Sequence, residues 1–415
     1  FGYGTYTTLR SGVYVGDDFF YKKSDSRYEK NISNYIEQTS DHEFTIVSHD
    51  KKQEVSYEIE KDYPLFLEKM KQELTYPMAW GNSAQTDFSE WRKMARTIVL
   101  DAMLAPPPVA KEYGMEVVAI EQRAGYEARK IRFNLSGYSR VPAYLLVPAG
   151  KGPFPAVVLL HDHGAHFSIG KEKMIRPFDV DSLILADADN WVHQCYDDQY
   201  VGDYLASKGY VVISIDALFW GERGRKEGAR YESQQSLACV FEMLGRSWSG
   251  TISYEDMYTA DFLASLKEVD ADRIGCMGFS MGAYRSWMLS ALSDRVKAGA
   301  AVCWLTTTEY QLSPHYGRGK GDSNYANVLP GLRRYLDYPH IASIACPKAM
   351  LFFNGRHDKL FPVPAVENAY SQLHTVWNSQ NADDKLITKL WELPHFCSKE
   401  MQAEILSFFN KQLSK

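Results

Sequence analysis

The pentapeptide Gly278-Phe279-Ser280-Met281-Gly282 decides the fold of this chain. It follows the run 273–277, which is typical of a buried strand, and it precedes 283–289, which has the composition of a helix. A serine between two glycines at a strand-to-helix turn matches the G-x-S-x-G nucleophile elbow. The sharp turn excludes bulky neighbours and exposes the hydroxyl beside the N–H groups of a helix start. Ser280 is therefore the predicted nucleophile.

An acid and a histidine follow the serine in the chain order that this elbow requires. A serine hydroxyl needs a histidine to take its proton and an acid to orient that histidine. The predicted strand 348–354 leads to Asp358, and the last predicted strand, 386–391, leads to His395. Both lie past the carboxyl ends of strands, where an open α/β sheet builds its site. Asp358 could instead only cap a turn, which leaves two alternative acids, Glu222 and Glu392.

Strands and helices alternate from residue 115 onward, as in a doubly wound, mostly parallel sheet. We expect an α/β fold with about eight strands and a catalytic domain over 111–415. Residues 1–110 are polar and have little strand periodicity, so they are predicted to be a mostly helical extension packed on that domain. Its clearest helix is expected over 88–100, with Asp87 as N-cap.

Composition excludes several classes of function. The 415 residues are 45% hydrophobic and 24% charged, with a net charge of −6, so neither nucleic acid nor an anionic membrane surface is an expected partner. No apolar run approaches the length of a membrane span. The six cysteines lack metal-ligand spacing, and no cofactor is predicted. Long segments at 219–254 and 306–341 exceed ordinary connections and are expected to form lids or substrate loops.

The loop after the first buried parallel strand carries the predicted oxyanion hole. The N–H of Met281, just after the serine, would be the first donor, and the N–H of Ala165 or His166 the second. The same loop supports a rival, because His161, His163 and His166 could ligate zinc. That pattern is similar to the H-x-H-x-D-H motif of metallo-β-lactamase-like hydrolases, but Ala165 stands where the motif needs its aspartate.

Several segments together resemble the α/β-hydrolase superfamily, and within it the dienelactone-hydrolase and acetyl-xylan-esterase-like group. The matching segments are 161–164, 216–224, 278–282, 355–362 and 394–396. The resemblance implies a serine esterase that removes small ester groups from plant-type polysaccharides or oligosaccharides. It also implies a periplasmic or secreted location.

The predicted triad cannot distinguish an acetate on a sugar from the methyl ester of a uronic acid. Acetate is the first expectation, and a uronic-acid methyl ester, as in pectin, is the alternative. A uronate would favour basic residues near the pocket, for which the candidates are Lys171, Lys173, Arg223, Arg285 and Arg318. The predicted substrate-binding residues are His163, Trp220, Arg223 and Arg285. An ion pair of Glu222 with Arg285 in the core is the structural alternative.

Overall fold

The computed structural model describes residues 12–15, 18–22, 35–38, 43–47, 52–56, 58–60, 63–313 and 323–414. Side chains are described at 58–59, 63–313 and 325–414. The chain divides into two compact units, 1–73 and 74–415. Each unit is considered by itself.

The N-terminal unit is built on strands. Its five-stranded sheet has the order β1 (Gly12–Val15), β2 (Asp18–Lys22), β3 (Tyr35–Gln38), β4 (Glu43–Val47) and β5 (Lys52–Ser56). A short hairpin of β6 (Ile59–Glu60) and β7 (Tyr63–Pro64) and one helix, α2 (Leu67–Gln72), follow. For the residues of this unit that the structure describes, the prediction of a mostly helical extension is therefore wrong. Short runs such as Glu43-Phe44-Thr45-Ile46-Val47 favour strands, because β-branched and aromatic residues suit a pleated surface.

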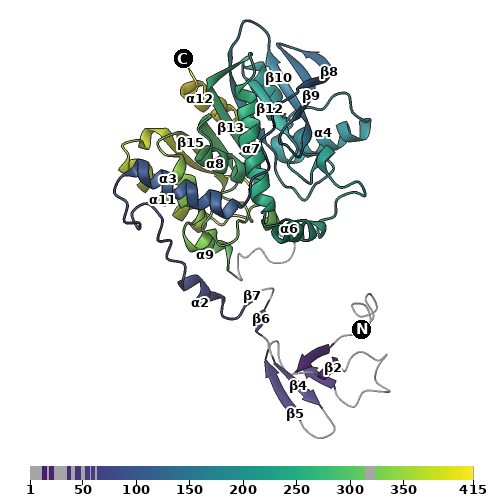
Figure 1. Cartoon of the computed structure of the whole chain (residues 1–415), viewed down its shortest axis with the longest axis vertical. Coiled ribbons are helices and arrows are strands. Elements are labelled where there is room, and N and C mark those ends of the chain that lie inside the picture. Colours follow the sequence, from purple (N-terminus) through teal and green to yellow (C-terminus); the bar gives the residue numbers. More distant parts are fainter. Residues whose placement is uncertain are drawn as a thin grey trace. The chain divides into compact units, whose positions relative to one another are not determined.

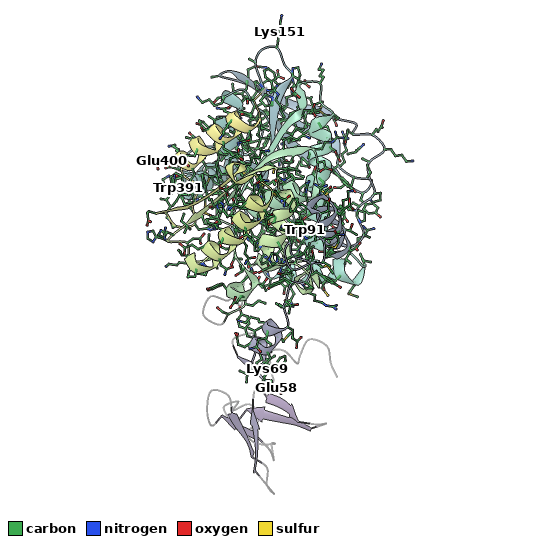
Figure 2. The ribbon with its side chains drawn as sticks, turned by 90° about the vertical axis from the view of Figure 1, so that its left-hand side faces the viewer. Glu58, Lys69, Trp91, Lys151, Trp391 and Glu400 are labelled. Atoms are coloured by element: carbon green, nitrogen blue, oxygen red, sulfur yellow. The ribbon has the colours of Figure 1, made fainter. Side chains whose placement is uncertain are left out.

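Helix α3 (Phe88–Met103) confirms the predicted helix but belongs to the larger unit, residues 74–415. The Asp87 side chain accepts a hydrogen bond from the Glu90 N–H at 3.0 Å, as expected of an N-cap. The residues Trp91, Ala95, Val99 and Met103 recur every fourth position and are fully buried in the core. Figure 2 labels Trp91 among the side chains of this unit. The unit boundary therefore precedes this helix, and the predicted boundary at residue 110 is wrong.

The larger unit, residues 74–415, contains a nine-stranded sheet, in agreement with the predicted α/β fold class. Its strand order is β16-β15-β14-β13-β11-β12-β10-β9-β8. Six strands of this sheet are parallel, namely β11 (Phe154–Leu160), β12 (Val211–Ile215), β13 (Val269–Phe279), β14 (Val296–Val302), β15 (Ala349–Gly355) and β16 (Leu386–Trp391). The antiparallel strands β8 (Glu116–Arg123), β9 (Tyr126–Asn134) and β10 (Arg140–Pro148) extend one edge.

Helices cover both faces of this sheet (Figure 1). Side chains alternate along β11, so that Ala156, Val158 and Leu160 face a cluster with α7 (Trp248–Ala264), whereas Val157 and Leu159 face the opposite cluster. The α7 face also carries α8 (Met281–Leu292) and α11 (Val363–Ser379). The other face carries α4 (Ser182–Tyr196), α5 (Val201–Ser207) and α12 (Lys399–Gln412). Two-sided burial explains why the parallel strands are continuously apolar.

The long connections converge beside the elbow. The first holds α6 (Ser233–Met243) and the second holds α9 (Thr308–Gln311) and α10 (Tyr338–Ala342), while 314–322 lies outside the described residues. One buried cluster joins Met281 to Phe167, Trp220, Trp248 and Ala326. Both connections thus pack next to the residue that follows Ser280. Within the described part of the chain, every helix is too short or too polar to cross a membrane.

Candidate active site

Ser280 occupies a strained turn between β13 and α8. Its φ of 55° and ψ of −122° are unusual for a residue with a side chain. A Cβ on Gly278 would lie 2.0 Å from the carbonyl oxygen of Gly282, and a Cβ on Gly282 would lie 1.8 Å from the carbonyl oxygen of Leu160. Only glycine fits at either position. The backbone N–H of Ser280 donates to Val302 on β14 at 2.8 Å, which fixes the turn to the sheet.

The start of α8 supplies N–H groups next to the serine. The first helical hydrogen bond runs from the N–H of Ala283 to the carbonyl oxygen of Ser280 at 2.8 Å. The N–H groups of Met281 and Gly282 precede that bond and belong to the first turn, which has no intrahelical acceptors. A helix start also favours negative charge. The predicted first oxyanion donor, Met281, therefore stands at a suitable position.

Asp358 and His395 are brought together as predicted. The imidazole Nδ1 of His395 donates to Asp358 Oδ2 at 2.6 Å, within the expected range for a hydrogen bond. The other carboxylate oxygen accepts the N–H of Leu360 at 2.8 Å. The Asp358 side chain is fully buried, whereas 24% of the His395 side chain is exposed. This arrangement fixes the tautomer and orientation of an accessible base.

The alternative acids lie elsewhere. Glu392 is 71% exposed and forms ion pairs with Arg356 at 2.8 Å and His357 at 3.2 Å. Glu222 accepts from the ammonium of Lys171 at 2.8 Å. Asp358 is therefore the acid that contacts His395.

The three histidines of the loop after β11 contact different partners. Nε2 of His161 accepts the N–H of Ala217 at 3.0 Å, and its Nδ1 lies 2.8 Å from the carbonyl oxygen of Asp162. Nε2 of His163 contacts Gln234 at 2.6 Å, and Nε2 of His166 contacts Asp187 at 2.7 Å. Burial lowers the pKa of His161 well below its usual value, so the ring is neutral. The zinc hypothesis has no support here, because no group of potential metal ligands among the described residues contains these three histidines.

The predicted second oxyanion donors are also engaged. The N–H of Ala165 donates to Nδ1 of His163 at 2.9 Å, and the N–H of His166 donates to the carbonyl oxygen of His163 at 3.3 Å. Both N–H groups thus have acceptors within the loop. The second donor of the oxyanion hole stays a prediction. The tight turn, with positive φ at Gly164 and Ala165, directs both groups inward.

A buried ion pair that sequence reasoning missed holds this loop in place. The ammonium of Lys173 lies 3.2 Å from Asp162 Oδ1, and both side chains are almost fully buried. The other oxygen of Asp162 accepts from the Tyr196 hydroxyl at 2.6 Å and from the Trp191 indole at 3.1 Å. Lys173 therefore anchors the loop and does not face a substrate. The acid of this pair, Asp162, directly follows His161 in the sequence. That position is the one sequence signal that could have suggested the pair.

Two of the predicted substrate-binding residues, Arg285 and Arg223, form buried ion pairs. Arg285 is 1% exposed and forms a two-pronged bond to Asp256 on α7, at 2.6 and 2.9 Å. Arg223 forms the same kind of bond to Glu255, with both distances 2.7 Å. The expected pair of Glu222 with Arg285 is absent from these described contacts, because α8 turns Arg285 toward α7.

Trp220 and His163 are likewise interior residues. The indole of Trp220 is fully buried and donates to the carbonyl oxygen of His163 at 3.1 Å. His163 itself is 3% exposed, and its ring contacts Gln234 and the N–H of Ala165. Both side chains therefore contact the loop, and their predicted contact with substrate stays a prediction. Arg318, the remaining candidate cation, lies outside the described residues.

Lys171 occupies the centre of a buried acidic group. Its ammonium contacts Glu172 at 2.6 Å, Asp216 at 2.9 Å and Glu222 at 2.8 Å. Burial raises the pKa of Asp216 to about 6, against the opposing effect of Lys171. The three carboxylates raise the pKa of Lys171 well above its usual value, so the lysine remains charged. These acids are one of two groups of potential metal ligands among the described residues, but the ammonium already supplies their cation. The second group is Cys303, Asp358 and His395.

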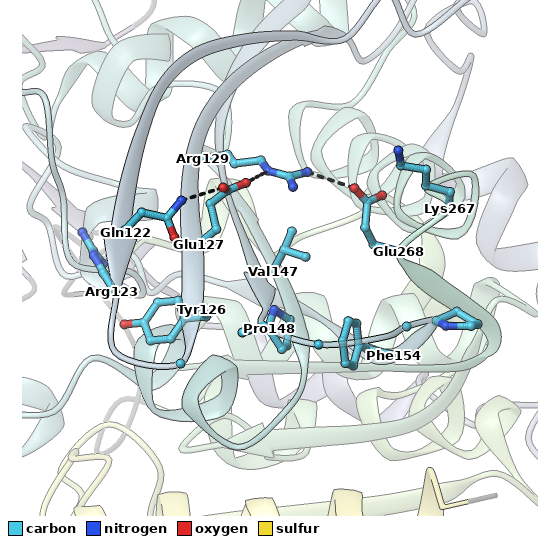
Figure 3. Close-up of a pocket in the computed structure, with 15 residues that line it drawn as sticks. Gln122, Arg123, Tyr126, Glu127, Arg129, Val147, Pro148, Phe154, Lys267 and Glu268 are labelled. Atoms are coloured by element: carbon cyan, nitrogen blue, oxygen red, sulfur yellow. Dashed lines mark hydrogen bonds and ion pairs between the residues drawn. The ribbon is translucent and has the colours of Figure 1, made fainter.

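A hollow lies at the amino ends of the parallel strands, away from Ser280, Asp358 and His395. It lies between the β8–β9 hairpin and the starts of β11 and β13 (Figure 3). Arg129 bridges Glu127 at 2.5 Å and Glu268 at 3.1 Å, and Gln122 donates to Glu127 at 2.7 Å. Arg129, Glu127 and Glu268 are thus paired with one another across the hollow. Because Ser280, Asp358 and His395 follow the carboxyl ends of their strands, this hollow is remote from them.

Comparisons with known proteins agree with this fold. The chain is 27% identical over 312 residues to the hydrolase candidate YtaP of Bacillus subtilis (strain 168), covering 75% of this chain and 96% of that protein. A candidate acetyl xylan esterase, BF1801 from Bacteroides fragilis, has a TM-score of 0.57 at 19% identity, covering 74% of this chain and 75% of the other. Methylesterase BT1017 has a TM-score of 0.55 at 17% identity, covering 91% and 73% of the two chains.

A third solved structure is also similar. A glucuronoyl esterase from Solibacter usitatus has a TM-score of 0.54 at 12% identity, and the match covers 77% of this chain and 91% of that one. The sequence profile of the Abhydrolase family matches residues 38–380, which is most of the chain. The protein described above therefore belongs to the Abhydrolase family and has the α/β-hydrolase fold.

Proposed function

We propose that this chain is a serine esterase that removes small acyl groups, above all acetate, from carbohydrates. The observation that carries the proposal is the 2.6 Å bond from His395 Nδ1 to buried Asp358, in the same chain as a strained Ser280 elbow. A neutral imidazole held by a carboxylate through Nδ1 keeps Nε2 for a proton from the serine. No other described histidine combines that carboxylate contact with a position past the last strand of the sheet.

The proposed reaction has two steps. Ser280 Oγ attacks the ester carbonyl while His395 Nε2 takes its proton, and the resulting imidazolium is stabilised by Asp358. The tetrahedral oxyanion is stabilised by the N–H of Met281 at the start of α8. His395 then gives its proton to the departing sugar oxygen, which leaves an acyl-Ser280 enzyme. Water, deprotonated by His395, hydrolyses that ester and restores the serine.

Acetate is favoured over a uronic-acid methyl ester by the state of the basic residues. A galacturonate chain carries carboxylates beside its methyl esters, so a methylesterase needs uncompensated positive charge near its site. Arg223, Arg285 and Lys173 are each buried against a carboxylate, and Lys171 faces three of them. None of these four cations is left to attract a uronate. A neutral sugar ester needs no such cation.

The solved relatives support a carbohydrate ester only in a general way. One is named as a candidate acetyl xylan esterase, one as a methylesterase and one as a glucuronoyl esterase. Their low identity transfers the fold, so the choice of acetate rests on the charge argument. Since polysaccharides do not cross membranes, we also propose a periplasmic or secreted location, which cell fractionation would test.

The test compares three substrates at equal ester concentration: acetylated xylan, methyl-esterified pectin and a long-chain acylglycerol. Mass spectrometry of the products should show acetate release from xylan as the fastest reaction. Ser280→Ala should lower kcat by about 10⁶-fold with its circular dichroism unchanged. A preference for pectin would replace acetate by the methyl ester, and a preference for the lipid would refute a carbohydrate substrate. Loss of wild-type activity with a chelator alone would contradict the serine mechanism.

A further inference from the structure

Cys303 shares a compact group with Asp358 and His395. One potential ligand atom from each of the three residues lies within 4.8 Å of the other two. Cys303 directly follows β14, and Asp358 and His395 follow β15 and β16, which are its successive neighbours in the sheet. The N–H of Cys303 donates to Phe353 at 2.6 Å, and its φ of 60° is held by that contact. The sheet therefore places a thiol where the proposed mechanism has no use for one.

We propose that Cys303, Asp358 and His395 form an inhibitory site for a thiophilic divalent cation such as Zn²⁺ or Cd²⁺. Thiolate sulfur, imidazole nitrogen and carboxylate oxygen are the three protein ligand types of zinc. One thiolate and one carboxylate neutralise the two positive charges of the ion. A neutral assembly is what a site with two fully buried ligands requires, because an uncompensated buried charge is costly. The inhibitory effect rests on the proposed function, since it arises by removing His395 from catalysis.

Metal binding at this site forms three bonds and displaces protons from its ligands. Bonds form from the metal to Cys303 sulfur, to a His395 nitrogen and to an Asp358 oxygen. Burial raises the pKa of the Cys303 thiol, so the metal-free protein carries it as S–H. The thiol proton is released to solvent, and when Nδ1 is the ligand its proton moves to Nε2, so that the imidazole binds the metal as a neutral group. The bond between Nδ1 and Oδ2 is then lost.

The geometry needs a small movement. Bonds of about 2.0–2.3 Å in a tetrahedral site separate ligand atoms by about 3.3 Å. Nδ1 and Oδ2, now 2.6 Å apart, must therefore move apart by less than about 1 Å. His395 can supply that movement, because it lies on the loop after the last strand and is partly exposed, whereas Cys303 and Asp358 are fixed to β14 and β15.

Cadmium titration of the full chain tests the site directly. The readouts are calorimetric affinity and the ultraviolet charge-transfer band of a cadmium thiolate. Wild type and Cys239→Ser, which removes the exposed cysteine, should both show the band. Cys303→Ser and Cys303→Ala should weaken binding by about tenfold or more and abolish the band. An unchanged band in Cys303→Ser, or no band in wild type, would overturn the proposal. Cys303→Ser nearly preserves volume, so it remains decisive should the alanine variant not fold.

Two further experiments distinguish a failure of the metal-site proposal from a failure of the esterase proposal. Ser280→Ala should keep wild-type cadmium affinity, because Ser280 is not a ligand. If hydrolysis is absent in every assay while binding still requires Cys303, the esterase proposal fails and the metal site stands. If hydrolysis is normal but Zn²⁺ inhibits wild type and Cys303→Ser equally, the metal site fails and the esterase stands.

Discussion

Two sets of ionisable residues at the carboxyl end of the sheet differ in how their charges are satisfied. Asp358 holds His395, which keeps 24% of its side chain exposed. The nearby cations Lys171, Lys173, Arg223 and Arg285 are at most 6% exposed, and each contacts one or more carboxylates. A group that exchanges protons with a substrate must keep one face available, whereas a buried charge must be fully paired. Partner and burial together separate the proposed catalytic pair from the four buried cations.

The largest effect, a loss of kcat, is expected at the pair of Asp358 with His395. Asp358→Asn should lower kcat by about 10⁴-fold, because the amide favours the wrong imidazole tautomer. The matched control is Glu392→Gln, which removes an exposed acid that contacts His357. Steady-state kinetics on an acetylated substrate provide the measurement. Equal losses in both variants would mean that the wrong acid has been assigned.

A large effect on stability, without a specific effect on catalysis, is expected at the buried ion pair of Arg285 with Asp256. Arg285→Met should lower the free energy of unfolding by about 3–5 kcal/mol, because Asp256 is left buried and unpaired. The double variant with Asp256→Leu should recover much of that loss. Denaturant unfolding measures both. A raised KM with unchanged stability would instead restore Arg285 as a substrate-binding residue.

The acidic group around Lys171 should produce a pH-dependent stability. Burial raises the pKa of Asp216 to about 6, above its value of about 3.9 in an unfolded chain. The folded state then binds more protons between these values, so this contribution is present below about pH 4 and lost as the pH rises through about 6. Relative to Asp216→Asn, the wild type should therefore lose stability as the pH rises from 4 to 6. Denaturant unfolding at several pH values measures this difference, and a constant or opposite difference would contradict the assignment.

The smallest effect is expected at an exposed ion pair whose acid, Asp261, lies on α7, the helix that also carries Asp256. Arg295 contacts Asp261 at 2.9 Å, with 54% and 46% of the two side chains exposed. Arg295→Ala should change the free energy of unfolding by less than about 1 kcal/mol, because water screens the pair. A loss equal to that of Arg285→Met would show that burial does not explain the difference between the two pairs.

Some features were predictable because they depend on short-range sterics. The glycines at 278 and 282 mark the elbow, since any larger residue would collide with a backbone carbonyl. The chain order of Ser280, Asp358 and His395 followed from strands that could be recognised by their apolar composition. The helix over 88–100 was evident from its periodicity and its cap at Asp87.

Other features depended on which segments meet. Arg285 and Asp256 are 29 positions apart, and Lys171 and Asp216 are 45 apart, so no local pattern reveals that they pair. The same holds for α3, whose periodicity predicted a helix but not the core in which it is buried. The sequence alone thus determined the elbow, the order of the triad and the α/β class, because these arise from local backbone geometry and strand periodicity. The tertiary structure decided which cations are neutralised and which N–H groups are already engaged, because burial and pairing are set by packing between distant segments.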